Sequence, residues 1–232
     1  MTIYRLLLSA AALLSAFAPL SAADWVIERS TYYLTAEQQS FSDFPAPPAE
    51  GTRAYKKDFA ALHAWQDRRT AEQCAKAAVG AKAGFDEFFS DISPFPSPLT
   101  GEAAAIFKRI KIETDGVAAD VKDRYKRQRP FHTDASLDPC LGRIGGLAYP
   151  SGHATISRMY ALVLAELVPA DKKKFLARAD EAALDRVIGG VHHPSDIEAG
   201  KRLADRLFKA YRKSPVFKAD LETLRSLLKK AE

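Results

Sequence analysis

The sequence predicts an all-α fold, a single compact helical domain. Apolar residues recur every three or four positions along most of the second half of the chain, which is the spacing of a helix with one buried face. Alternating apolar and polar runs typical of β-strands are missing from the sequence. Proline and glycine stand between the apolar stripes, where helices would have to stop. With 232 residues, no internal repeat and no long linker, the chain fits one domain with a sizeable core.

The first 23 residues have the pattern of a secretory signal peptide. Arg5 gives a positive start, residues 6–20 form an apolar run too short to cross a bilayer comfortably, and small residues favour cleavage after Ala23. An uncleaved anchor is the alternative. We therefore expect the mature chain, residues 24–232, to be periplasmic and without a membrane anchor. Its side-chain net charge is one less than the +5 of the whole chain, because cleavage removes Arg5.

The charge pattern argues against a nucleic-acid partner. The 34 basic and 29 acidic residues are interspersed, and no run of arginines with interleaved aromatic residues occurs in the sequence. We expect a mixed-charge, solvated surface.

The chain has two cysteines, Cys74 and Cys140. An even number in an exported protein favours a disulfide, which would stabilise the fold by about 4 kcal/mol in the chain-entropy model. Two separate buried thiols are the alternative. Without a CxxC motif, two cysteines this far apart do not predict a zinc site.

The first half is predicted to form an arm followed by helices. Residues 24–50 lack a clear period and end in a proline-rich segment, so we expect an extended arm that wraps the domain. Residues 52–89 are rich in helix formers, and Thr70 with Gln73 has the spacing of a capping box that would divide them into two helices. Three prolines in residues 93–98 then force a loop.

The middle of the chain is predicted to form a long helix and a loop. Thr100 can cap the helix, which would continue to Arg129 unless residues 114–116 break it. Pro130 ends it, because the residue before a proline is pushed out of helical geometry. Residues 131–149 contain several glycines and prolines and are predicted to form a loop.

The remaining sequence predicts four helices. Residues 151–168 and 171–188 carry helical stripes that stop at a proline and at a Gly-Gly pair. Another helix opens near Ser195, which has capping-box spacing with Glu198. Residues 217–228 supply the apolar stripe of a last helix.

Lys122 and Arg129 form the first of three stretches that indicate chemistry. They are seven residues apart, close to two helical turns, so both can lie on one face of a helix. An arginine fork matches two phosphate oxygens and a lysine adds a point charge. Arg124, Lys126 and Arg127 lie between them, and an ordinary solvated basic face is the alternative interpretation.

The segment Pro150-Ser151-Gly152-His153 stands where a loop enters a helix. A helix N-terminus presents free N–H groups and positive dipole to an anion. Gly152 would let the backbone come close to the anion, and the Ser151 hydroxyl adds a donor. An ordinary serine cap is the alternative. The sequence contains no Gly-x-Ser-x-Gly nucleophile elbow, which disfavours a serine hydrolase.

Arg186, His192 and Asp196 form the third stretch, across another junction of loop and helix. A carboxylate beside one nitrogen of His192 would fix its tautomer and aim the other nitrogen at a reacting atom. Arg186 could also bind phosphate. The remaining histidines are interpreted as surface loop residues: His63, His132 and His193.

Two histidines and three cations suit phosphoryl transfer, which needs neutralised phosphate oxygens, a nucleophile in line and a proton for the leaving oxygen. A neutral imidazole can attack phosphorus and form a phosphohistidine, and a protonated one can protonate the leaving alcohol. The sequence shows no carboxylate cluster suited to a metal. We therefore expect a metal-free mechanism without a cofactor.

Together the three stretches resemble the signature of the PAP2 (type 2 phosphatidic acid phosphatase) superfamily, which includes the vanadium haloperoxidases. They read Lys122-x6-Arg129-Pro130, Pro150-Ser151-Gly152-His153 and Arg186-x5-His192-x3-Asp196. Within that superfamily the chain is similar to the soluble, secreted bacterial class A non-specific acid phosphatases, over most of the mature sequence and more loosely before residue 115. The resemblance implies a helical fold of the PAP2/vanadium haloperoxidase type. It also implies a metal-independent, vanadate-inhibited phosphatase with a small phosphorylated substrate, in a family whose members are often homo-oligomers.

By this resemblance His192 would be the nucleophile, Asp196 its orienting partner, and His153 the general acid and later the base. Five residues would hold the phosphate: Lys122, Arg129, Ser151, Gly152 and Arg186. Asp185 stands where the family pattern usually has serine. Its negative charge would weaken anion binding or bind Arg186.

Other functions are compatible with the same residues. A lipid phosphate or diphosphate phosphatase would keep the site, although no later run in the sequence has the roughly 20 apolar residues of a membrane span. A haloperoxidase would need bound vanadate, and the mature chain is short for one. A non-catalytic periplasmic anion-binding module would not need histidines at this spacing.

We expect residues 85–100 and 131–149 to form the walls of the substrate pocket. The sequence does not identify the physiological substrate.

Overall fold

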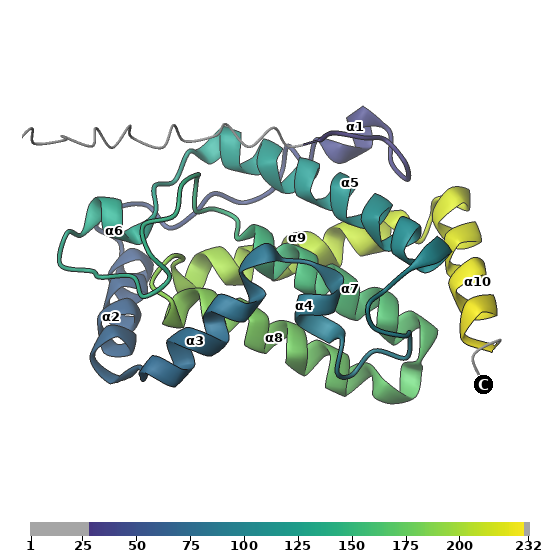
Figure 1. Ribbon diagram of the computed structural model, residues 1–232. Helices are drawn as coiled ribbons and strands as arrows, with labels where there is room; N and C mark the ends of the chain where they lie inside the picture. Colours follow the sequence, from purple (N-terminus) through teal and green to yellow (C-terminus); the bar gives the residue numbers. More distant parts are fainter. Residues whose placement is uncertain (1–27, 230–232) are drawn as a thin grey trace, which may run out of the picture.

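The computed structural model describes residues 28–229, and every regular element there is a helix (Figure 1). The all-α prediction is confirmed for this part of the chain, in which no helix is long and apolar enough to cross a membrane. The predicted signal peptide, residues 1–23, lies outside the described residues. The helices are α1 (Ala36–Gln39), α2 (Arg53–Arg68), α3 (Ala71–Val79), η1 (Gly80–Lys82), α4 (Phe85–Phe89), α5 (Gly101–Tyr125), α6 (Pro130–Thr133), α7 (Gly152–Leu167), η2 (Pro169–Asp171), α8 (Lys172–Ile188), α9 (Pro194–Tyr211) and α10 (Pro215–Lys229).

Helix α7 lies at the centre of the domain and packs against α8, α9 and α5. In Figure 1, α5 runs along one side of this group, with α2, α3 and α6 towards one end and α10 at the other. Ile156 and Met159 of α7 are fully buried in the main apolar core. Ala154, one turn earlier, belongs to a smaller core that includes Leu62 of α2 and Ile197 of α9. The first turn of α7 is therefore fixed where two cores meet.

Most of the predicted helix boundaries are confirmed. Thr70 caps α3 through a capping box with Gln73, and this box separates α2 from α3 as expected. Residues 28–50 are mainly irregular, as the arm prediction required, apart from the short helix α1. The arm is fastened to α5 because the buried Glu113 carboxylate accepts the backbone N–H groups of Tyr33 (2.8 Å) and Leu34 (3.0 Å).

The expected break at residues 114–116 does not occur, and α5 is continuous from Gly101 to Tyr125. Gly116 is buried where the arm crosses the helix, and a Cβ there would lie 3.7 Å from the backbone oxygen of Glu28. That distance is an ordinary van der Waals contact, so the arm packs directly on the helix at this glycine without interrupting it.

Two predicted boundaries were wrong. Helix α5 does not reach Arg129, because Lys126 adopts left-handed geometry (φ 48°) directly after Tyr125. Pro130 instead begins α6, a position where its missing N–H is not needed. Lys122 and Arg129 therefore do not share a helix face.

The capping box predicted for the start of α9 was also misplaced. The N-cap is His193, Pro194 occupies the first turn, and the reciprocal bonds join His193 to Asp196. Ser195 is therefore not the cap, and its predicted partner Glu198 has no part in the box. The competing proline at the first helical position shifted the start by two residues.

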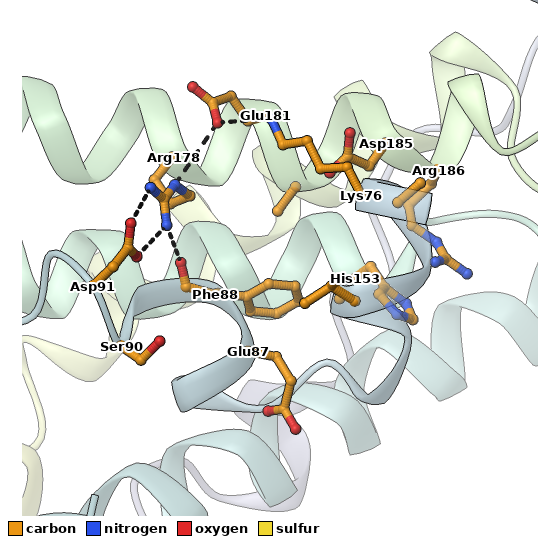
Figure 2. A pocket seen from close by; sticks show the side chains of 14 residues that line it. Lys76, Glu87, Phe88, Ser90, Asp91, His153, Arg178, Glu181, Asp185 and Arg186 are labelled. Carbon is orange, nitrogen blue, oxygen red and sulfur yellow. Dashed lines mark hydrogen bonds and ion pairs between the residues drawn. The ribbon is translucent and has the colours of Figure 1, made fainter. Parts of the chain in front are cut away.

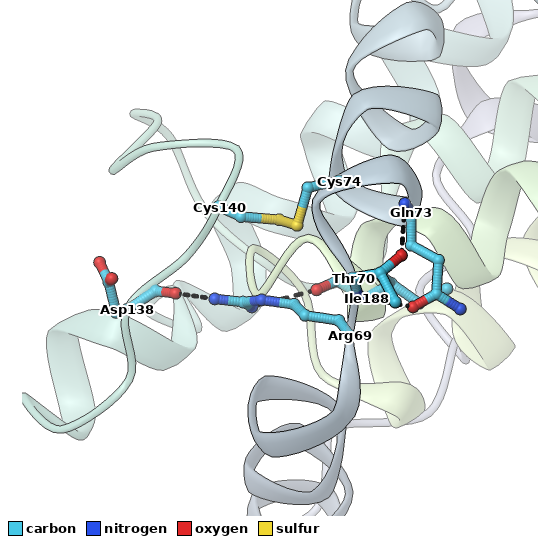
Figure 3. Close-up of a disulfide and its surroundings, with 7 residues drawn as sticks. All are labelled: Arg69, Thr70, Gln73, Cys74, Asp138, Cys140 and Ile188. Carbon is cyan, nitrogen blue, oxygen red and sulfur yellow. Dashed lines mark hydrogen bonds between the residues drawn. A yellow bond between two sulfur atoms is a disulfide. The ribbon is translucent and has the colours of Figure 1, made fainter.

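The expected disulfide between Cys74 and Cys140 is present, with the two Cα atoms 6.0 Å apart (Figure 3). It joins α3 to the loop that follows α6. Arg69 reinforces this junction by donating to the backbone oxygens of Ile188 (3.1 Å) and Asp138. The loop is thus tied both to α3 and to the end of α8.

Removal of this disulfide should lower the stability of the fold. The bond spans 66 positions of sequence, and a closed loop of that size is worth roughly 4 kcal/mol in the chain-entropy model. We expect the double variant Cys74→Ser, Cys140→Ser to lose about this much unfolding free energy in urea denaturation. An unchanged midpoint and slope would contradict the expectation.

Candidate active site

The structure brings the three predicted stretches together at the N-terminus of α7. The Ser151 N–H donates to the backbone oxygen of Asp196 (3.0 Å), which joins the start of α7 to the start of α9. Lys122, on the last turns of α5, donates to the carbonyls of Leu147 (2.7 Å) and Pro150 (2.6 Å). Three segments distant in sequence therefore converge on one site.

Gly200 permits the contact between α9 and α7 that this arrangement needs. A Cβ at this position would lie 2.6 Å from the backbone oxygen of Ser151 and 2.9 Å from the Ala154 Cβ. Neither group can move without displacing the start of α7. Glycine is therefore required for α9 to approach α7 this closely.

His192 is held in the tautomer that a nucleophile requires. The Arg129 Nη1 lies 2.7 Å from the His192 Nε2, and because a guanidinium can only donate, Nε2 must carry the lone pair. The proton is then on Nδ1, which faces the Asp196 carboxylate at 3.4 Å. Nε2 therefore points towards the Arg129 guanidinium and away from the carboxylate.

Arg129 is positioned by backbone oxygens. Its Nε and Nη2 donate to Gly146 and Gly145 (both 3.1 Å), and Nη1 also donates to Val191 (2.9 Å). The predicted loop at residues 131–149 thus contributes carbonyl groups that fix the guanidinium. The buried arginine presents one edge to His192.

Arg186 is the least satisfied group of the site. Only 3% of the residue is exposed, and its Nε and Nη1 have no hydrogen-bond partner among residues 28–229. Leaving charged donors buried and unpaired is unfavourable. The free N–H groups on these two nitrogens are suited to the oxygens of an anion.

The site is strongly electropositive, and this changes its acid–base properties. Burial and the neighbouring Arg129 lower the pKa of Lys122 to about 7, and burial with Arg129 lowers the pKa of Arg186 to about 10. Burial and Arg186 lower the pKa of His153 to about 3. Burial and Arg129 also hold the pKa of His192 well below its usual value. Both imidazoles are therefore neutral when no anion is bound.

Asp196 remains ionised although it is completely buried. Burial acts to raise its pKa, but hydrogen bonds from His192 and His193 outweigh burial and hold the pKa well below the usual range. The site therefore combines one fixed carboxylate with several cations.

The other predicted residues lie around the same centre. His153 is in the first turn of α7, where its Nε2 contacts the carbonyl of Ala81 at 3.0 Å. Ser151 is fully buried, and its hydroxyl accepts the Ala154 N–H (3.4 Å), so its proton stays available to a ligand. A Cβ on Gly152 would meet nothing within 4 Å, so the backbone there is open to an approaching group.

Three residues that support the site were missed or misread in the sequence. Arg127, interpreted as solvated, is buried and donates to the Asp196 Oδ1 (2.6 Å) and the Asp58 Oδ2 (2.9 Å). Asp58, from α2, also accepts the Ser195 N–H (2.9 Å). The interpretation of His193 as a surface residue was wrong, because it is 1% exposed and its Nδ1 lies 2.9 Å from the Asp196 Oδ2.

The sequence contained a local signal for one of these three residues, His193. Asp196 three positions after His193 has the spacing of a cap, and His193 is indeed the N-cap of α9. Asp58 had no local signal, since it lies on a helix far from the motifs. His132 is exposed, and the His63 side chain is 41% exposed, so their surface interpretation holds, although both lie on helices.

Comparison with known proteins identifies the family. A model described as the PAP2 superfamily matches residues 110–207. The non-specific acid phosphatase of Providencia stuartii is 31% identical over 82% of each chain, and that of Salmonella typhimurium is 26% identical over 91% of this chain and 90% of its own. Among solved structures, a transmembrane PAP2-type phosphatidylglycerolphosphate phosphatase from Bacillus subtilis matches 70% of this chain and 87% of its own, with a TM-score of 0.50 at 19% identity.

The helical fold and buried cationic site therefore define a phosphatase of the PAP2 type. The chain belongs to the PAP2 superfamily, among its non-specific acid phosphatases, and is a phosphoric monoester hydrolase. The family and enzyme class expected from the three stretches are thus confirmed. The solved structure, at its low identity, supports the fold alone.

Replacement of Arg127 should test whether the buried network positions Asp196. In Arg127→Met the Asp196 carboxylate loses its bond to α2 through Asp58, so the orientation of His192 should be less well defined. We expect kcat to fall about 10- to 100-fold with little change in KM, the size typical of losing a group that orients a ligand or catalytic residue.

The matched control is Arg124→Met, which removes an exposed arginine that binds the carbonyls of Ser40 and Phe41. This variant should retain the wild-type kcat. Equal losses in both variants, or a loss confined to KM in Arg127→Met, would show that Arg127 does not act through Asp196.

Proposed function

We propose that the protein is a metal-independent acid phosphatase that hydrolyses phosphomonoesters through a phosphohistidine on His192. The observation that carries the proposal is the buried Arg186 guanidinium, which has two nitrogens without hydrogen-bond partners in the described part of the chain, beside a site that holds two neutral imidazoles. A phosphate dianion would supply the missing acceptors and offset the positive charge.

Phosphate binding would use donors that already surround the site. The Nη1 of Arg129, which now points at the His192 Nε2, could turn its N–H to a phosphate oxygen and free the lone pair. Arg186 would donate its free N–H groups to phosphate oxygens, and Lys122 would gain a counter-charge that raises its pKa. The Ser151 hydroxyl and the accessible backbone at Gly152 would supply the remaining hydrogen-bond donors to the phosphate.

The first chemical step would form a bond from the His192 Nε2 to phosphorus and break the bond from phosphorus to the ester oxygen. The proton for the leaving oxygen would come from His153, whose pKa rises when a bound phosphate offsets the charge of Arg186. Asp196 would stabilise the positive charge that appears on the His192 ring.

The second step would return the enzyme to its starting state. His153, now neutral, would take a proton from water, and the oxygen would attack phosphorus as the bond to Nε2 breaks. Inorganic phosphate then leaves.

The cations of the site would perform the charge neutralisation that Mg²⁺ performs in many phosphoryl-transfer enzymes. Among residues 28–229, no group of three or more His, Cys, Asp or Glu side chains is arranged to hold a metal ion.

We also propose that the mature protein works in the periplasm. A disulfide between Cys74 and Cys140 persists in oxidising compartments, and the first 23 residues have the pattern of a secretory signal. N-terminal sequencing of the protein recovered from a periplasmic fraction would test this proposal. An intact N-terminus in the cytosolic fraction would contradict it.

Replacement of the nucleophile gives the first test of the mechanism. His192→Ala should lose at least about 10⁴-fold in kcat on an aryl phosphate, because the covalent route is then closed. The matched control is His132→Ala, which removes an exposed histidine. Wild-type activity should survive EDTA and be inhibited by vanadate. Residual activity in His192→Ala near the wild-type level, or loss with EDTA, would refute the mechanism.

The pH dependence of KM gives a second test. Burial and Arg129 set the pKa of Lys122 to about 7, so this side chain is charged below and neutral above that pH. Phosphate binding favours the charged form, so KM should rise about tenfold between roughly pH 6.5 and 9 for a substrate that is dianionic throughout. Lys122→Arg, which stays charged, should flatten this rise. A wild-type KM that does not change over this range would contradict the role of Lys122.

A further inference from the structure

A pocket of about 380 Å³ opens beside the phosphate-binding residues (Figure 2). His153 and Arg186 lie at one end of it, and Arg178 with Asp91 lies at the other. The walls come from α3, α4 and α8, so the predicted wall at residues 85–100 contributes to it. An ester whose phosphate is bound by Arg186 and whose leaving oxygen faces His153 would extend its alcohol portion into this pocket.

The two other cations of the pocket are already paired. Arg178 binds both oxygens of Asp91 at 2.6 and 2.9 Å and lies 3.7 Å from Glu181. Lys76 is 3.3 Å from the same Glu181 carboxylate. Neither cation is therefore free to attract a negatively charged group on a substrate.

The lining also contains a carboxylate that is not paired with either of these cations. Asp185 lines the pocket in addition to the two paired acids, whereas the carboxylate of Glu87 lies over Gly84 at the start of α4 and points away from Asp185 (Figure 2). Asp185 is half-buried and immediately precedes Arg186 in the sequence. Its carboxylate interacts with the charges of Lys76 and Arg186 without a hydrogen bond to either. Burial raises the pKa of this carboxyl group, so its charge is present only above the raised pKa. When it is ionised, the alcohol portion of a substrate would meet an unpaired negative charge close to the phosphate site.

The rest of the pocket offers apolar surface. Ala77, Phe88 and Ala182 contribute to the lining, and Val79 at the pocket is 68% exposed, which is unusual for a large apolar side chain. The Phe88 ring packs edge-on to His153, with 6.3 Å between ring centroids. This apolar surface begins directly beside the group that would protonate the leaving oxygen.

We infer that this pocket is a leaving-group subsite for phosphomonoesters of uncharged or cationic alcohols, and that Asp185 makes it disfavour anionic ones. A second phosphate or a carboxylate in the alcohol portion would be repelled by Asp185, while apolar carbon would be accepted by Phe88 and Val79. The inference rests on the proposed phosphatase function and specifies the class of substrate for that site.

Three aryl phosphates of similar size and phenol acidity would test the inference: 4-ethylphenyl phosphate, 4-(2-aminoethyl)phenyl phosphate and 4-(2-carboxyethyl)phenyl phosphate. They carry a neutral, a cationic and an anionic substituent. In the wild type we expect kcat/KM to be lower for the anionic than for the neutral ester by between about twofold and about 30-fold, the effect of one charge over roughly 8 Å at effective dielectric constants of about 80 and about 20. Added salt should reduce this ratio, because it screens exposed charges.

Asp185→Asn and Asp185→Ser should each move the anionic-to-neutral ratio of kcat/KM towards one and lower the cationic-to-neutral ratio. Asp180→Asn is the matched control: Asp180 lies on the same helix, is paired with Lys201 at 3.2 Å and is not part of the pocket. It removes the same charge from the molecule and should leave both ratios at their wild-type values. Two different replacements of Asp185 are compared so that the test remains valid if one of the variants folds poorly.

The outcomes separate the inference from the function on which it rests. Wild-type turnover of 4-ethylphenyl phosphate with equal rates for all three esters, and ratios unaltered in both Asp185 variants, would overturn the subsite and leave the phosphatase function standing. Equal changes in Asp185→Asn and Asp180→Asn would overturn it as well, since the effect would then be one of overall charge. A wild type that binds phosphate but hydrolyses none of the esters would contradict the proposed function itself.

Discussion

The site depends on three cations that the fold holds close to one another inside the domain. Arg129 and Lys122 donate hydrogen bonds to backbone carbonyls, whereas two nitrogens of Arg186 have no hydrogen-bond partner among the described residues. Such an arrangement is unfavourable in isolation, because charged groups lose hydration and repel each other. The packed helices around α7 must hold it in place. A bound phosphate would offset this repulsion, which would contribute to its affinity.

The same charges determine which groups can act as acid, base and nucleophile. Burial and the neighbouring Arg129 hold the pKa of His192 well below its usual value, which keeps the ring neutral and preserves its lone pair, while Asp196 stays ionised through its bonds to His192 and His193. Arg127 and Asp58 extend this network to α2, a helix with no residue in the family signature. Orientation of the nucleophile therefore depends on contacts across the domain as well as on the motif that contains it.

The helices and motif residues could be predicted from the sequence because their signals are local. Apolar periodicity, the capping box at Thr70 and the spacing of His192 and Asp196 need no knowledge of the fold. The end of α5 was misjudged because left-handed geometry at Lys126 leaves no clear mark in the sequence. The roles of Asp58 and Arg127 could not be predicted, since they arise only when α2 meets the loop before α6. The unpartnered state of Arg186 likewise follows from packing, which no local pattern encodes.

The central claim is that the phosphoryl group passes through the Nε2 of His192. Rapid mixing of the protein with an aryl phosphate, quenching in alkali to preserve phosphohistidine, and peptide mass spectrometry would locate the group directly. The account predicts a transient phosphoryl group on the peptide that contains His192, formed as fast as the first turnover releases phenol. A phosphoryl group on Ser151 or His153, or steady turnover with no phosphorylated peptide at any time, would contradict it.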